Sequence, residues 1–89
     1  MGTIIVRHKV KDYGKWRSLF DGHAEKQRAA GLTNPRVYRS VDDNNEIVVV
    51  LDAADIKRAK DFAASPDLKE TMMRAGVIDV PTIHFLETA

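Results

Sequence analysis

The stretch Ile47-Val48-Val49-Val50-Leu51 decides the architecture of this chain of 89 residues. Successive side chains of a β-strand point to opposite faces of the sheet, so an unbroken apolar run requires cover on both faces. A chain of this length has room for helices on one face only. We therefore expect a second copy of the same chain to cover the other face.

The composition bounds the class of protein. The length fits one domain, placed at residues 1–89, and a domain this small gains stability from oligomerisation. A net charge of +1 gives no general attraction to nucleic acid or to a membrane surface, and the lack of cysteine excludes disulfides and thiolate metal sites. Neither a membrane-spanning stretch nor a signal-peptide layout is recognisable, so we expect a cytoplasmic protein.

Residues 3–10 have the alternating pattern of a strand. One face of this strand carries three aliphatic side chains and a histidine: Ile4, Val6, His8 and Val10. The opposite face is more polar, so we expect the apolar face to meet the helices. His8 is therefore predicted to point toward them.

Two further strands are predicted, one before and one after the apolar run in the sequence. A short strand is predicted at residues 36–41, and the turn residues at 42–45 join it to the run as a hairpin. The last strand is predicted at residues 80–87, where His84 and Ile83 point to opposite faces.

Two helical segments lie between the strands. The first begins at the N-cap Asp12 and ends at Gly31, and its inward residues recur at helical spacing: Tyr13, Trp16, Phe20, His23, Gln27 and Ala30. The second begins after Asp52 or Asp55. It is interrupted at Ser65-Pro66, where a serine N-cap and a first-turn proline start a short new helix that Gly76 ends.

The order of the elements is strand, helix, strand, strand, helix, strand. This order is typical of the ferredoxin-like α+β fold, a four-stranded antiparallel sheet with both helices on one face. Its connectivity places the first and third strands in the centre of the sheet, where the run at 47–51 would be buried. We therefore predict a ferredoxin-like βαββαβ domain.

Two motifs and the element order carry a resemblance to a known superfamily. The motifs are an aromatic first helix, Tyr13-x-x-Trp16-x-x-x-Phe20, and a broken second helix, Phe62-Ala63-Ala64-Ser65-Pro66-Asp67-Leu68. On these features the chain resembles the dimeric α+β barrel superfamily, which includes antibiotic-biosynthesis monooxygenases, stress-responsive barrel proteins, small polyketide cyclases and haem-degrading monooxygenases. The resemblance implies two sheets packed face to face in a dimer, with a pocket between sheet and helices in each subunit.

The resemblance leaves the chemistry open. Small cyclases of this superfamily carry a histidine directly after the proline of the broken helix, where this chain has Asp67. Haem-degrading relatives place an axial histidine near the second helix, and here no histidine lies between Asp42 and Pro81. Both chemistries are disfavoured, and the same fold hosts catalysts and plain binders.

The histidines are the candidates for catalysis. His23 shares a helical stripe with Trp16 and Phe20, so we expect it to point at the sheet, and its titration near neutrality suits proton transfer. His8 lies on the helix side of a central strand, and His84 lies on the strand expected beside it. We predict His23 as the acid/base, assisted by His8 or His84. The alternative is that these histidines are structural or surface residues.

Aromatic residues are the candidates for ligand binding: Trp16, Phe20, Tyr38 and Phe62. Trp16 suits the core anchor of a small domain as well as a pocket wall. Tyr38 and Arg39 alternate on one strand, and whichever faces inward would bind a phenolate or a carboxylate. No metal-ligand spacing such as H-x-x-x-H is present, so we predict no metal site and no tightly bound cofactor.

These features predict a homodimer, paired through its sheet face, with a pocket for a small hydrophobic or aromatic ligand in each subunit. The leading function is a cofactor-independent monooxygenase or cyclase-like enzyme acting on a small aromatic or polyketide-like compound. One alternative is a non-catalytic ligand-binding or stress-associated dimer, and a second is a haem binder. No nucleic-acid or membrane partner is expected.

Overall fold

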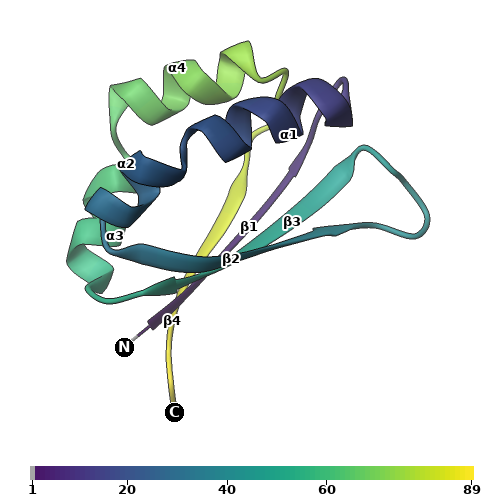
Figure 1. The fold of residues 1–89 in the computed structure, drawn as a ribbon. Coiled ribbons are helices and arrows are strands. Elements are labelled where there is room, and N and C mark those ends of the chain that lie inside the picture. Colours follow the sequence, from purple (N-terminus) through teal and green to yellow (C-terminus); the bar gives the residue numbers. More distant parts are fainter. Residues whose placement is uncertain (1) are drawn as a thin grey trace.

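The elements follow the predicted order in the structure, a computed structural model that describes residues 2–89 (Figure 1). Met1, the first residue of the predicted domain, lies outside the described residues. The elements are β1 (Gly2–Lys9), α1 (Tyr13–Gly22), α2 (Ala24–Ala29), β2 (Leu32–Arg39), β3 (Glu46–Ala53), α3 (Ile56–Ala63), α4 (Pro66–Arg74) and β4 (Thr82–Glu87). None of the helices in residues 2–89 is long and apolar enough to cross a membrane.

The four strands form one antiparallel sheet in the order β2-β3-β1-β4, which confirms the ferredoxin-like α+β fold. The central strands β1 and β3 pair so that Val6 lies opposite Val49 and His8 lies opposite Ile47. Residues directly opposite one another in an antiparallel pair share a face. Even-numbered residues of β1 and odd-numbered residues of β3 therefore form one surface.

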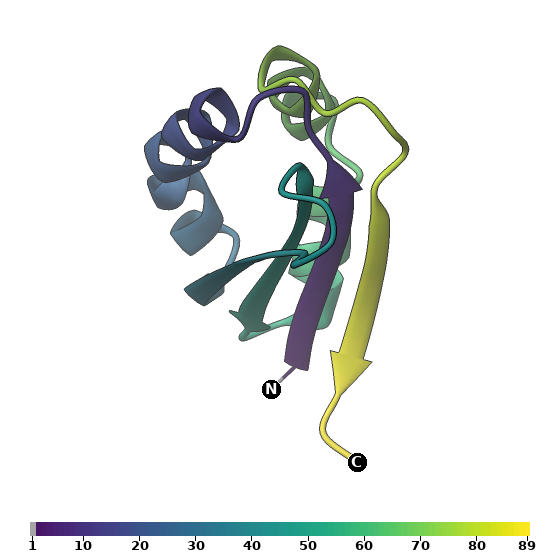
Figure 2. The ribbon, with the colours of Figure 1, turned by 90° about the vertical axis from the view of Figure 1, so that its right-hand side faces the viewer.

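The apolar run divides between the two faces of the sheet. Ile47, Val49 and Leu51 are at most 5% exposed and pack under the helices, whereas Val48 and Val50 are half-buried and point the other way. Figure 2 shows that the helices lie on one side of the sheet only. We call the other side the outer face, and its apolar centre is formed by Ile5, Val48, Val50 and Leu86.

The first predicted helix is two helices in the structure. α1 ends at Gly22 and α2 begins at Ala24, because the His23 N–H bonds to the carbonyl of Phe20 at 3.1 Å, three residues back, instead of continuing the α-helical ladder. Gly22 has low helix propensity and directly precedes the break. The inward stripe survives the break, since Trp16, His23 and Gln27 are all buried.

The break in the second helical segment is confirmed. Asp55, rather than Asp52, caps α3 by accepting the N–H groups of Lys57 and Arg58. Ser65 caps α4 by accepting the N–H of Leu68 at 3.2 Å, and Pro66 occupies the first turn. The predicted glycine ends are also present, since Gly31 and Gly76 have φ angles of +80° and +84°.

The edge strands differ from their predicted bounds. β2 begins four residues before Arg36, because a register shift between Thr33 and Arg36 accommodates Asn34, with φ of 52°, and Pro35 within the strand. Asn-Pro is typical of a loop in sequence, but a β-bulge on an edge strand also admits proline and a left-handed asparagine. At the other edge, β4 begins at Thr82 rather than at residue 80.

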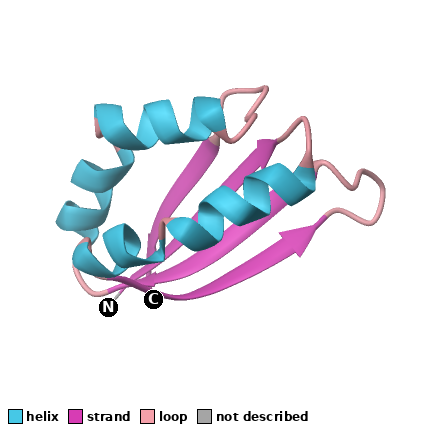
Figure 3. Cartoon of the chain, turned by 45° about the horizontal axis from the view of Figure 1, so that its top comes forward, coloured by secondary structure: helices cyan, strands magenta, loops and turns pink. Residues whose placement is uncertain are grey.

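The helices form two arms over the sheet, α1 with α2 and α3 with α4 (Figure 3). Trp16, 3% exposed, anchors the first arm in the core. Ala59 and Ala75, at most 4% exposed, belong to the same core and hold the second arm against it. An ion pair joins the arms at the surface, where Lys26 Nζ of α2 lies 2.9 Å from Asp67 Oδ2 of α4.

Removing the cap of α3 is expected to lower stability. Asp55→Ala leaves two N–H groups of the first turn without their acceptor, so the free energy of unfolding should fall by about 1 kcal/mol. Asp61→Ala, an exposed residue on the same helix, is the matched control and should change it by less than about 0.5 kcal/mol. Urea unfolding followed by circular dichroism measures both, and equal effects of the two variants would contradict the capping role.

Candidate functional site

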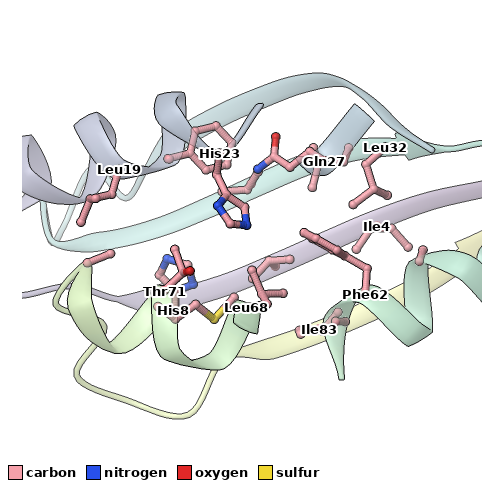
Figure 4. Close-up of a pocket in the computed structure, with 18 of the residues that line it drawn as sticks. Ile4, His8, Leu19, His23, Gln27, Leu32, Phe62, Leu68, Thr71 and Ile83 are labelled. Atoms are coloured by element: carbon pink, nitrogen blue, oxygen red, sulfur yellow. The ribbon is translucent and has the colours of Figure 1, made fainter. Parts of the chain in front are cut away.

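A cavity of about 90 Å³ lies between the inner face of the sheet and the two helical arms. Its lining is aliphatic or aromatic except for four polar side chains, which come from β1, the α1–α2 junction, α2 and α4: His8, His23, Gln27 and Thr71. Figure 4 shows His23 and Gln27 approaching from one side of the cavity, and His8 and Thr71 from the other. The fold therefore brings two imidazoles to one apolar space.

His8 is the deeper of the two imidazoles. Its place in β1, opposite Ile47, puts it on the inner face, where it is 2% exposed and meets the edge of Trp16 with ring centroids 5.6 Å apart. Neither Nδ1 nor Nε2 has a hydrogen-bond partner within residues 2–89. Burial lowers the pKa of His8 below its ordinary value of 6.5, and the negative charge of Asp79 opposes this shift only in part.

His23 occupies the junction of α1 and α2 and is 9% exposed. Its ring centroid is 6.0 Å from that of Phe62, and its Nε2 is also without a hydrogen-bond partner among the residues described. Burial lowers the pKa of His23, and Lys26 lowers it further, while Asp67 acts in the opposite direction. Both imidazoles are therefore neutral at neutral pH and able to accept a proton or a hydrogen bond.

Trp16 and Phe20 both line the cavity. Their rings are stacked with centroids 4.9 Å apart and an interplanar angle of 18°. Trp16 belongs to the buried core and also lines the cavity. Phe62, from α3, lines the cavity as well.

Two polar residues of the cavity were not among the predicted site residues. Gln27 is 8% exposed and lies four residues after His23 on the same stripe. Thr71 follows Leu68 at helical spacing on α4, and its Oγ1 donates a hydrogen bond to the carbonyl of Asp67 at 2.9 Å. Helical spacing from His23 and Leu68 is the signal in the sequence that would have found both.

His84 and Tyr38 lie on the outer face, away from the cavity. His84 is exposed and pairs with Ile5, and Tyr38 is 55% exposed and pairs with Val48. Strand alternation is the reason, because the inward neighbours of these residues are Ile83 and Val37. The expectation that His84 and Tyr38 line the pocket is therefore corrected.

Arg39, the neighbour of Tyr38, is the residue of that strand that faces the helices. Its guanidinium carbon lies 4.0 Å from the ring centroid of Tyr13, a cation–π distance. It does not line the cavity, so no charged side chain from β2 enters the site. In the part of the chain that the structure describes, no three His, Asp or Glu side chains gather into a candidate metal site.

The four-stranded sheet under helices is shared with solved structures of antibiotic-biosynthesis-monooxygenase-like proteins, so the predicted resemblance is confirmed as a likeness of fold. One solved structure with this fold is an antibiotic biosynthesis monooxygenase, 14% identical, with a TM-score of 0.72 over 100% of this chain and 99% of that chain.

Two further solved structures share the fold. SnoaB, a cofactor-independent oxygenase from Streptomyces nogalater, is 16% identical, with a TM-score of 0.72 over 99% of this chain and 94% of that chain. A conserved protein from Methanosarcina mazei is 13% identical, with a TM-score of 0.76 over 99% and 92% of the two chains. No protein-family model and no curated protein matches the sequence.

The buried imidazole of His8 is expected to make stability depend on pH. The pKa of His8 is lowered in the folded chain, so below pH 6.5 the unfolded chain takes up a proton that the folded chain resists. The free energy of unfolding should therefore fall as the pH drops below 6.5, with a limiting slope of about 1.4 kcal/mol per pH unit for one histidine.

His8→Leu should reduce this slope and leave the contribution of His23, whose pKa is also lowered, because the apolar replacement takes up no proton in either state. Urea unfolding at a series of pH values between about 5 and 8 measures the slope in both proteins. An unchanged slope in His8→Leu would show that His8 is not the group responsible.

Proposed function

We propose that the chain is a monooxygenase without a tightly bound cofactor, acting on a small aromatic or polyketide-like compound, with His23 as the acid/base. The observation that carries this proposal is the pair of buried imidazoles, His8 and His23, that line one apolar cavity. Both nitrogens of His8 and Nε2 of His23 have no hydrogen-bond partner within residues 2–89. Buried polar groups are costly unless they are hydrogen-bonded, so these nitrogens favour a bound molecule with polar groups of its own.

The chemistry begins with a proton transfer inside the cavity. Neutral His23 accepts a proton from a phenolic hydroxyl or an enolisable carbon, while His8 holds a second polar group of the substrate in place. The resulting anion is electron-rich and reacts with dioxygen. One oxygen atom enters the ring as a new carbonyl group, and the second leaves as water with the two hydrogens that the ring compound loses.

The likeness to SnoaB supports an oxygenase over a cyclase. SnoaB is a cofactor-independent oxygenase and shares this fold across the whole chain. In this chain Asp67 stands where small cyclases of the superfamily carry a histidine, and Asp67 is exposed and paired with Lys26 at the surface. The site that remains for catalysis is the one built around His23.

Oxygen consumption tests the role of His23. The purified protein is incubated with a panel of naphthols and hydroxyanthrones, and the compound that supports uptake at an oxygen electrode is used for the variants. His23→Gln should lower kcat by about 10²–10⁴-fold, as expected for the loss of a general base. The control is Tyr38→Phe on the outer face, which should retain activity.

Three observations would redirect the proposal. Full activity of His23→Gln would show that another group is the acid/base. Compounds that quench Trp16 fluorescence but support no oxygen uptake would favour the alternative of a non-catalytic binding protein. A visible Soret band in the purified protein would favour the alternative of a haem binder.

We further propose that two copies of the chain pair through the outer face. Its apolar centre of Ile5, Val48, Val50 and Leu86 is covered by no helix, and β1 and β3 are the strands buried on their other side. Small domains gain stability when such a surface is buried against a second copy. The dimer implied by the superfamily resemblance has the same arrangement.

A charge in the centre of the outer face is expected to dissociate the dimer. Val50→Asp would bury an unpaired carboxylate, which costs several kcal/mol, and should yield monomers or unfolded chains. Met73→Asp is the matched control, because Met73 is 70% exposed on α4 and lies on the helix side of the sheet. Sedimentation at micromolar concentration measures the mass, and a monomeric wild-type protein would contradict the dimer.

A further inference from the structure

The lining of the cavity contains polar side chains that can bind a ligand, but no charged ones. All of its polar side chains are uncharged at neutral pH: His8, His23, Gln27 and Thr71. Within residues 2–89, no Asp, Glu, Lys or Arg contributes to the lining. An ionised ligand group would leave water for a space in which nothing balances its charge, and that transfer is strongly unfavourable.

The charges that act on the pKa values of the two imidazoles are already paired outside the cavity. Lys26 and Asp67, which act on His23, form an ion pair with each other at 2.9 Å, and both are more than half exposed. Asp79, which acts on His8, accepts the N–H of Lys9 at 2.8 Å and lies 4.0 Å from the Arg7 guanidinium. None of these charges is free to compensate a charge inside.

The hydrogen-bonding groups of His8 and Thr71 indicate what a complementary ligand must carry. A neutral imidazole has one N–H donor and one acceptor nitrogen, and both nitrogens of His8 are unpartnered within residues 2–89. The Thr71 hydroxyl already donates to the Asp67 carbonyl, so it offers the cavity only an acceptor. A ligand that satisfies these groups carries an acceptor for the His8 N–H and at least one hydroxyl donor.

The wall of the cavity sets the shape of that ligand. Trp16 and Phe20, whose rings are stacked on each other, both line the cavity that His8 and His23 also line. A flat, apolar ring packs on aromatic side chains with favourable dispersion and aromatic contacts. The ring, the acceptor and the donor together describe an uncharged aromatic hydroxy-carbonyl compound.

We propose that the cavity selects its ligand by charge, so that it binds uncharged aromatic hydroxy-carbonyl compounds and excludes the corresponding carboxylates. This inference rests on the proposed function, because it takes the cavity as the binding site. It adds selection by charge, which the proposed function alone does not require. A proton moved from the bound hydroxyl to an imidazole stays within the complex, and the net charge of the cavity remains zero.

A series of four small probes on one ring tests the proposal. The probes are 3-hydroxyacetophenone, methyl 3-hydroxybenzoate, 3-hydroxybenzoate and acetophenone, and quenching of the single tryptophan, Trp16, reports binding. At pH 8 the first two should bind, and the carboxylate should bind about tenfold more weakly or worse than its own methyl ester. Acetophenone lacks the hydroxyl donor and should bind more weakly than 3-hydroxyacetophenone.

His8→Leu is the matched variant for the hydrogen-bonding part of the proposal. It removes the N–H that holds the ligand carbonyl and leaves His23 to accept the hydroxyl, so 3-hydroxyacetophenone and acetophenone should both bind more weakly. The preference for 3-hydroxyacetophenone over acetophenone should persist, which shows that the variant is folded and that the cavity is intact. Unchanged affinity of His8→Leu for both compounds would overturn the assignment of His8 to the carbonyl group.

The outcomes separate this inference from the proposed function. Equal binding of the carboxylate and its methyl ester overturns selection by charge and leaves the cavity as a binding site. Binding of none of the probes overturns both. Charge selection without oxygen uptake by any substrate supports the inference and contradicts the monooxygenase.

Discussion

The pairing of β1 with β3 is the constraint on which the rest of the structure depends. Its register sets His8 opposite Ile47 and Val6 opposite Val49, and it thereby decides which side chains lie under the helices. A slip of one residue would turn every side chain of a strand to the other face. His8 would then point away from the cavity, and the apolar centre of the outer face would lose its shape. The candidate site and the proposed dimer surface are two consequences of one register.

The cavity exists because the two helical arms cover the sheet without closing over its centre. Residues that line a void lose the contacts that a packed neighbour would provide, so a cavity costs stability, and more so in a domain this small. The exposed pair of Lys26 and Asp67 is worth little as a tie between the arms. The arms are held in place by their packing on the sheet, through Trp16 and Ala59 above all. A small domain that keeps such a space gives up stability for it, which is expected where the space serves binding.

The sequence predicted those residues whose direction follows from local periodicity. Alternation placed His8 inward, and helical spacing placed Trp16, Phe20 and His23 inward although the helix breaks at His23. The same alternation predicted that His84 and Ile83 point to opposite faces. The prediction that His84 assists in the site with His8 was wrong, because it used only the adjacency of their two strands and not the face to which each side chain points. The direction of Tyr38 depends on the register of β2, which the bulge at Asn34 and Pro35 shifts. The cavity itself depends on the separation of the two arms, and no pattern within one element encodes that distance.

The depth of the two imidazoles explains why they are assigned different tasks. His8 is 2% exposed on a central strand and lines the cavity. A proton accepted by His8 would create a buried imidazolium without a partner for its charge, so His8 suits binding a neutral group of the substrate. His23 is 9% exposed at a helix junction, and the surface charges of Lys26 and Asp67 both act on its pKa. A group that senses surface charge is close enough to water to release a proton after accepting one. Because an acid/base must exchange its proton in every turnover, the geometry favours His23 for that role and His8 for positioning.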